Sequence, residues 1–445
     1  MIADAAPARP DLHRVTNVPA GMRGGIASPA SGAIVLAGEH FAAAALYLLA
    51  GAIGLVWIAP ELAAGNYMSP HVAGVTHLFT LGWLTTTIFG ALYQLLPVAL
   101  GAPIRWPRLG HLSFWTFAPG AGVFACGVAE SSTVLHHAGI GLVTVGLALT
   151  VVNVGATLPR ARSRDVTWTA IALALAFLSS TLVIGVLLLH NLHTGFLGAE
   201  RVHVLATHMH VALIGWALMM IVGVSHRLLP MFLLAHGADT RWTRRAVVLL
   251  AIGVPALAVG LNTRFSAAAW VGLVLLETGF GAFALQAHAF YRARIRKRLD
   301  VGMRFAGTAL GFLLVAGVLA PFVLARGALS PRLGTAYVAA LLLGGIVLYI
   351  TGFFYKIVPL LAWTVRYRAR MGTGSAPTTT EMYSARVAGI QLAVMPAGVV
   401  LIVAGSLAGS AAADYAGAAL FAAAVVLFLS QLTRVAFGRA VPGGT

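Results

Sequence analysis

A seven-residue motif that occurs twice decides the fold of this chain. The first copy reads HLFTLGW at residues 77–83, and the second reads HVALIGW at residues 210–216. Both are followed, at the same distances, by a glycine and then by the triplet LLP, so the whole pattern recurs at an offset of 133 residues. A constant offset across several landmarks is typical of an internal repeat. Each copy begins with a histidine, and an ionisable side chain within a membrane span is costly and usually functional.

The composition places the chain in a membrane. Of its 445 residues, 59% are hydrophobic and only 9% are charged, and the mean hydropathy is +0.90. Soluble domains carry about 25% charged residues, so membrane lipid is the expected surrounding of this chain. The net charge of +17 comes from Lys and Arg in short loops between apolar runs. Such loops orient a membrane protein, and we therefore expect no nucleic-acid partner.

Twelve apolar runs are each near the ~20 residues that a helix needs to cross a bilayer. We therefore predict an all-α integral membrane fold with twelve transmembrane helices. The runs lie near residues 38–59, 70–98, 111–129, 133–157, 166–189, 202–234, 246–262, 266–291, 302–325, 334–363, 386–407 and 411–433.

The basic residues predict the orientation. With the N-terminus inside, every Lys and Arg falls on the inner side except Arg201, Arg264, Arg326 and Arg332. This asymmetry places both termini in the cytoplasm and the chain in the inner (cytoplasmic) membrane. Three aligned polar residues at the inner helix ends are expected to extend toward the interface: Gln94, Arg227 and Lys356.

The segments outside the spans are short. Residues 1–37 are rich in Ala, Pro and Gly and have no apolar run after a basic start. They are expected to form a disordered cytoplasmic tail and not a cleavable signal peptide. Residues 38–435 are expected to form a single membrane domain, followed by a cytoplasmic tail at residues 436–445.

A third, degenerate copy of the motif lies in the tenth span. Gly344, Gly352 and Pro359 keep the spacings of the glycines and the proline, but Ala339 stands where the histidine is expected. The twelve helices are therefore predicted to form three pseudo-symmetric four-helix units. Their approximate bounds are 38–165, 166–301 and 302–435.

On this topology nine histidines gather at the outer ends of four spans. They are His71, His77, His136, His137, His190, His193, His203, His208 and His210. Neutral imidazole is a common metal ligand, so we predict a haem or metal site in the outer third of the membrane. His208 and His210 lie roughly 200° apart around a helix and are therefore expected to face two different sites.

The segment from Thr207 to Pro230, with its His208-Met-His210 pattern, resembles the His-x-His helix of haem–copper oxidase subunit I, most closely the nitric-oxide reductase branch. The resemblance implies twelve helices in three four-helix arcs, as the repeat predicts. It also implies that His77 and His210 bind a low-spin haem from its two faces. His208 would then bind a second haem.

The sequence departs from the family in three respects, one of which is the absence of the family's histidine-plus-tyrosine or histidine-plus-glutamate motif of the catalytic helix. The His-x-His pattern lies on the sixth span and not on the tenth, and residues 243–262, the seventh span, contain no copper-binding histidine pair. His136 and His137 form an adjacent pair elsewhere. We predict these two and His203 as candidate ligands of a second metal, with copper the expected ion.

The predicted function is that of a membrane protein that binds haem b and resembles cytochrome c oxidase or nitric-oxide reductase subunit I. It would transfer electrons or act on nitric oxide or dioxygen, with a redox partner or companion subunit; no catalytic residue is assigned. The lone Cys126 excludes an internal disulfide and a Cys-x-x-Cys-His attachment for c-type haem. Two alternatives remain: a twelve-helix secondary transporter, and a non-catalytic protein that handles haem or copper.

Overall fold

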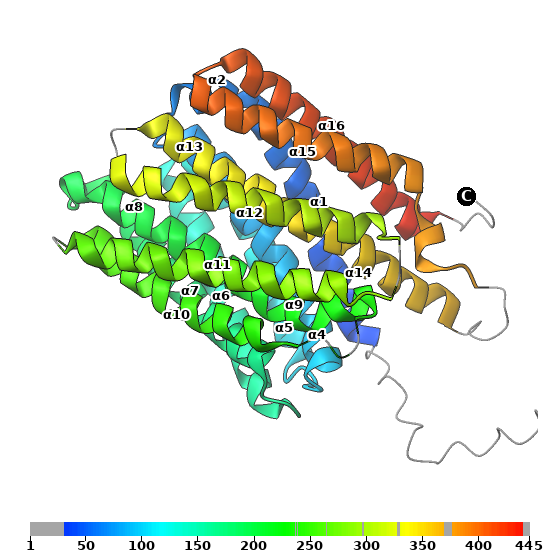
Figure 1. Cartoon of the computed structure of the whole chain (residues 1–445). Helices are drawn as coiled ribbons and strands as arrows, with labels where there is room; N and C mark the ends of the chain where they lie inside the picture. Colours follow the sequence, from blue (N-terminus) through cyan, green and yellow to red (C-terminus); the bar gives the residue numbers. More distant parts are fainter. Residues whose placement is uncertain are drawn as a thin grey trace, which may run out of the picture.

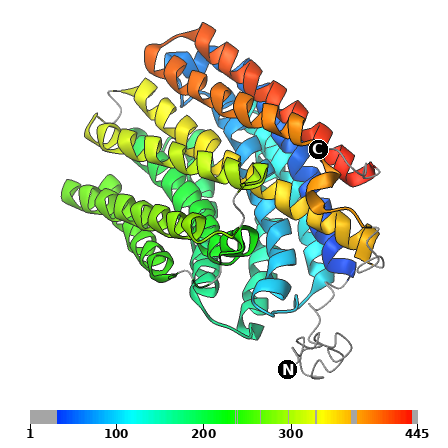
Figure 2. The same cartoon turned by 45° about the vertical axis from the view of Figure 1, so that its right-hand side comes forward.

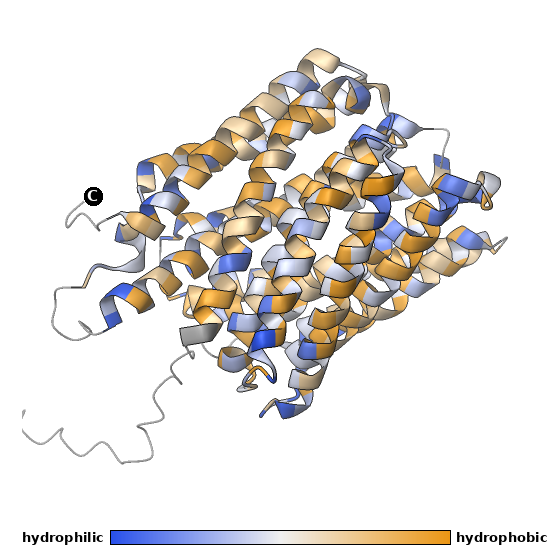
Figure 3. Cartoon of the chain, turned by 180° about the vertical axis from the view of Figure 1, so that it is seen from behind, coloured by the Kyte–Doolittle hydropathy of each residue, from blue (hydrophilic) through white to orange (hydrophobic). Residues whose placement is uncertain are grey.

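The computed structural model describes residues 31–438 except 236, 238, 264, 296–297, 327–329 and 369–375. In this part of the chain every regular element is a helix, and twelve helical spans are long and apolar enough to cross a membrane. Apolar residues run along the sides of the bundle, whereas polar residues gather near its ends (Figure 3). The prediction of an all-α fold with twelve transmembrane helices is confirmed.

Nine spans are single helices, and three are each built from several segments. The single helices are α1 (Ser31–Trp57), α5 (Pro107–Ala129), α6 (Thr133–Thr157), α7 (Val166–Thr194), α10 (Arg241–Asn262), α11 (Ser266–Arg292), α12 (Val301–Arg326), α15 (Ala385–Ala408) and α16 (Ala411–Phe437). The composite spans are Pro70–Ala99, Gly198–Leu233 and Pro331–Tyr367. Short helices lie in the connections, among them α2 (Ala59–Ala64) and η10 (Thr379–Met382).

The predicted N-terminal tail needs one correction. Helix α1 begins at Ser31 and its membrane-spanning part at Ala33, so the predicted boundary at residue 38 falls within the first span. The physical reason is that Ile34, Val35 and Leu36 extend the apolar run by about two helical turns. Residues 1–30 and 439–445, the rest of the two predicted tails, lie outside the described part of the chain.

The helices close into a ring. α6 of the first unit packs against α7 of the second, α11 of the second against α12 of the third, and α16 of the third against α1 of the first. Figures 1 and 2 show α15 and α16 side by side along one flank, next to α1. The three composite spans are the most buried of the twelve, so they form the centre of the ring.

Each composite span changes from α-helix to π-helix for eight residues and then back. The segments are α3 (Pro70–His77), η3 (Leu78–Thr85) and α4 (Thr86–Ala99); α8 (Arg201–His210), η6 (Val211–Leu218) and α9 (Met219–Leu233); α13 (Pro331–Ala339), η8 (Ala340–Val347) and α14 (Leu348–Tyr367). The π-helix starts directly after His77, His210 and Ala339. Because π-helices are rare, three of them at equivalent positions support the threefold repeat.

Glycine-to-aromatic packing also repeats in the three units. The first glycine of each motif lies against an aromatic ring from the first helix of its own unit. The pairs are Gly82 with Tyr47, Gly215 with Phe177, and Gly344 with Phe312. In the second unit, a Cβ added to Gly215 would lie only 2.7 Å from Cγ of Phe177. Small residues therefore let the central spans approach their neighbours closely, as in other membrane helix pairs.

Two units carry an equivalent ion pair between the start of their first helix and the second half of their second span. Asp300 precedes α12 and binds Lys356 of α14 with a distance of 2.6 Å between Oδ2 and Nζ. In the second unit Asp165 caps α7 and pairs with Arg227 of α9. Arg227 and Lys356 thus join the first and second spans of their units, beyond the interfacial role expected of them. In the first helices Tyr47 and Phe177 are equivalent, an offset of 130 residues, so Asp165 corresponds to Val35; Arg227 corresponds to Gln94, and the first unit therefore has no such pair.

We expect Gly215→Ala to destabilise the protein. The new methyl group would meet the stem of Phe177, and overpacking of this kind costs about 1–3 kcal/mol. Thermal unfolding of the purified protein in detergent should therefore show a lower Tm. Gly281→Ala is the matched control, because nothing lies within 4 Å of a Cβ at that helical position. Equal Tm values for the two variants would contradict this account of the packing.

The two ion pairs should differ in their contribution to stability. The side chains of Lys356 and Asp300 are only 11% and 13% exposed, whereas those of Arg227 and Asp165 are 40% and 26% exposed. Lys356→Met leaves a buried carboxylate unpaired, which costs about 3–5 kcal/mol. Arg227→Met breaks a more exposed pair, worth at most about 1 kcal/mol. Thermal unfolding should show the larger loss for Lys356→Met, and the reverse order would refute the comparison.

Candidate functional site

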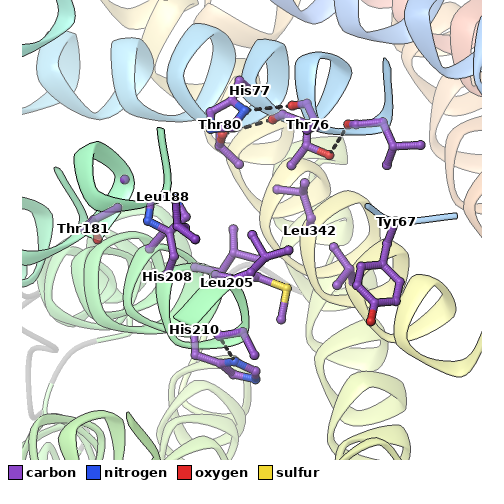
Figure 4. A pocket seen from close by; sticks show the side chains of 18 of the residues that line it. Tyr67, Thr76, His77, Thr80, Thr181, Leu188, Leu205, His208, His210 and Leu342 are labelled. Carbon is purple, nitrogen blue, oxygen red and sulfur yellow. Dashed lines mark hydrogen bonds between the residues drawn. The ribbon is translucent and has the colours of Figure 1, made fainter. Parts of the chain in front are cut away.

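A cavity of about 680 Å³ lies among the composite spans and α7 (Figure 4). Its volume is within the ~300–1,000 Å³ typical of sites for small molecules and cofactors. Leucine, valine and other apolar side chains make up most of the wall. Its polar groups include four imidazoles, from His77, His203, His208 and His210. The structure thus brings all three predicted haem ligands to one cavity.

His77 is the last residue of α3, directly before the π-helix. Its Nδ1 lies 2.7 Å from the carbonyl oxygen of Ala73, one turn earlier. Because a carbonyl only accepts, Nδ1 must carry the proton, and Nε2 keeps its lone pair. A backbone hydrogen bond of this kind often fixes the tautomer of a histidine that binds a metal. The ring also lies edge-on to Phe124, with 5.1 Å between the centroids.

His210 has the same position and the same backbone bond in the second unit. Its Nδ1 lies 2.7 Å from the carbonyl oxygen of Ala206, again four residues earlier. Its Nε2, however, lies 3.2 Å from the hydroxyl of Tyr337 on α13. The two rings are stacked, with centroids 5.8 Å apart. His210 is therefore engaged at both nitrogens, whereas His77 is held by one.

His208 projects from α8 away from His210, as the 200° separation predicted (Figure 4). Its ring lies against α7, where a Cβ added to Gly185 would be 3.1 Å from Cε1. Among the described residues its Nδ1 is buried and has no hydrogen-bond partner. Thr181 of α7 lies beside it in the wall of the cavity (Figure 4). An unpaired buried nitrogen costs about 1–3 kcal/mol, which a bound ligand could offset.

The three histidines predicted as ligands of a second metal are not brought together. His203 lines the cavity, half-exposed, with its Nδ1 3.0 Å from Glu200. His136 and His137 do not line the cavity; they pack against His193 of α7, with ring centroids 5.7 and 5.2 Å apart. In the part of the chain that the structure describes, no three His, Cys, Asp or Glu side chains are placed to hold a metal ion.

Tyr337 is the site residue that the sequence reasoning missed. The second and third copies of the motif are offset by 129 residues, which aligns Tyr337 with His208 and Ala339 with His210. Alignment of the third copy on the histidine position alone gives no weight to the residue two places before it. The 129-residue offset, which aligns Tyr337 with His208, is the sequence signal that could have identified Tyr337.

The residues present fit a haem better than a copper ion. An apolar cavity, histidines from two facing spans and an unpaired buried nitrogen on His208 are all consistent with a flat, largely apolar macrocycle. A copper site needs several convergent imidazole or thiolate ligands. The described residues provide no such group.

Comparison with known proteins identifies the fold. No protein-family model and no curated protein sequence matches the chain. Among solved structures, it is similar to a chain of a heme-copper terminal oxidase dimer determined by cryo-electron microscopy. The TM-score is 0.55 at 10% sequence identity, over 92% of this chain and 86% of the oxidase chain. The chain has the haem–copper oxidase fold. The fold implied by the sequence resemblance is confirmed.

Proposed function

We propose that this protein binds haem b in the central cavity and transfers electrons. One axial ligand would come from the second span, through His77, and the other from the sixth span. The observation that carries the proposal is that one apolar cavity is lined by imidazoles from both spans: His77 from the second, and His208 and His210 from the sixth. The likeness in fold to a heme-copper terminal oxidase chain supports it.

The residues around the cavity would favour electron transfer over chemistry at the iron. When bound, haem would supply a reversible one-electron couple, and two imidazoles of the cavity would hold it. The apolar wall would exclude water and so raise the cost of charge at the centre. The backbone bond to Ala73 would hold His77 in a fixed orientation. Reaction with nitric oxide or dioxygen would require an open position on a metal.

The surroundings of the protein form part of the proposal. We propose a location in the inner membrane with both termini in the cytoplasm, on the strength of the basic residues of the inner loops. A redox partner or companion subunit would supply or accept the electron. The relationship to the nitric-oxide reductase branch in particular rests on the His208-Met-His210 pattern alone.

A non-catalytic role in handling haem or copper is the second candidate. It is favoured by the lack of a convergent metal-ligand group among the described residues, since an oxidase would need a second metal beside the haem. Copper at His136 and His137 would need a third ligand, and His193 of the neighbouring helix is the imidazole closest to both rings.

Haem reconstitution tests the main proposal. Protein purified after haem-replete expression should show a Soret band and a low-spin α-band on reduction, and His77→Ala should lose the low-spin signal. His71→Ala is the matched control: His71 lies on the same helix, pairs with Glu61 and does not line the cavity. Wild-type protein without a Soret band, or the same spectrum for both variants, would refute the proposal.

Metal analysis tests the copper prediction separately. The Nδ1 of His137 bonds the carbonyl of Thr133, which leaves Nε2 as the ligating nitrogen. We expect copper bound by the wild-type protein to fall in His137→Ala, as measured by mass spectrometry of purified samples. His111→Ala serves as the control, because His111 pairs with Glu39 toward the inner end. Unchanged copper in His137→Ala would remove this residue from the set of ligands.

A further inference from the structure

The third unit presents a tyrosine where the second presents a histidine. Two positions of each central span matter here: the last residue before the π-helix and the residue two places earlier. They hold His77 and Val75 in the first unit, His210 and His208 in the second, and Ala339 and Tyr337 in the third. Tyr337 is 4% exposed, and its ring lies in the wall of the cavity. A buried phenol needs a hydrogen-bond partner, and here the partner is His210.

The bond to Tyr337 determines what His210 can do. Because Nδ1 of His210 donates to Ala206, its Nε2 must be the acceptor of the Tyr337 hydroxyl. A nitrogen whose lone pair accepts a hydrogen bond is not free to bind iron. The stacked rings and the buried hydroxyl hold His210 in this arrangement. Among the charged groups of the neighbouring helices, Glu277 of α11 lies near Tyr337, with its carboxylate against Gly317 of α12.

His208 is in the opposite situation. It projects away from His210, the partner of Tyr337, and its ring lies against Gly185 of α7 (Figure 4). Its Nδ1 lacks a hydrogen-bond partner among the described residues, although the Thr181 carbonyl faces the ring. A small shift would let Nδ1 donate to that carbonyl and leave Nε2 for a metal, as His77 already does. Gly185 provides the space that such a shift needs.

We propose that Tyr337 withholds His210 from iron and that His208 is therefore the axial partner of His77. This inference rests on the proposed haem function and reverses the sequence-based assignment, in which His210 pairs with His77. Tyr337 acts here as a positioning residue: it touches His210 and determines which of the two histidines on α8 can bind iron.

Spectra of four haem-reconstituted proteins test the assignment of the ligand. We expect His208→Ala to lose the low-spin α-band and low-spin paramagnetic resonance signal, whereas His210→Gln and Tyr337→Phe keep both. Glutamine retains an oxygen that can accept from Tyr337, so His210→Gln disturbs the packing little. Loss of the low-spin signal in His210→Gln, or its retention in His208→Ala, would overturn the inference. A wild-type protein without low-spin haem would instead overturn the proposed function.

A second measurement needs no haem. Diethylpyrocarbonate acylates an imidazole nitrogen that has a free lone pair, and mass spectrometry can locate the product. In the haem-free protein we expect Tyr337→Phe to raise the modification of His210 relative to that of His77, because only the Nε2 of His210 loses a bond. An unchanged ratio would show that Tyr337 does not occupy this nitrogen and would overturn the inference even if haem binds.

Discussion

The π-helical turn in each central span is the constraint on which the site depends. A π-helix changes the rotation per residue, so the side chains before and after the turn face neighbours that a straight α-helix would not offer them. The turn begins directly after His77 and His210, and it recurs after Ala339, where there is no histidine. Its presence in the third unit shows that it belongs to the packing of the scaffold and does not require a ligand.

Much of the fold could be predicted because lipid leaves a chain few options. Every backbone group of a span must be satisfied internally, so a long apolar run has to be a helix. Charges at the helix ends were harder to place. Arg227 and Lys356 were expected only to reach the interface, but they pair with Asp165 and Asp300. The local sequence does not show which aspartate will meet a basic residue some 60 positions later. The two residues meet because the first and second spans of each unit pack against each other.

The candidate site was predicted in part, for a comparable reason. The repeat identified His77 and His210, and helical geometry predicted that His208 points away from His210. The structure places all three around one cavity. Tyr337 was not predicted because the three units share the position of this residue but not its type: it is Val75 in the first unit, His208 in the second and Tyr337 in the third. The predicted metal ligands His203, His136 and His137 do not come together in the structure. A shared position near one end of the spans does not determine in which direction each side chain points around its helix. His136 and His137 face His193 and not the cavity.

The three units have the same backbone and different chemistry, and this difference is what can define a single site. A symmetric ring of three His-x-His helices would offer two sets of three equivalent imidazoles and no preferred place for one macrocycle. Here the first unit offers His77 alone, the second offers two histidines, and the third offers a phenol that occupies one of them. If His210 is occupied by Tyr337, His77 on the second span and His208 on the sixth remain available. Two histidines are what a bis-histidine haem requires.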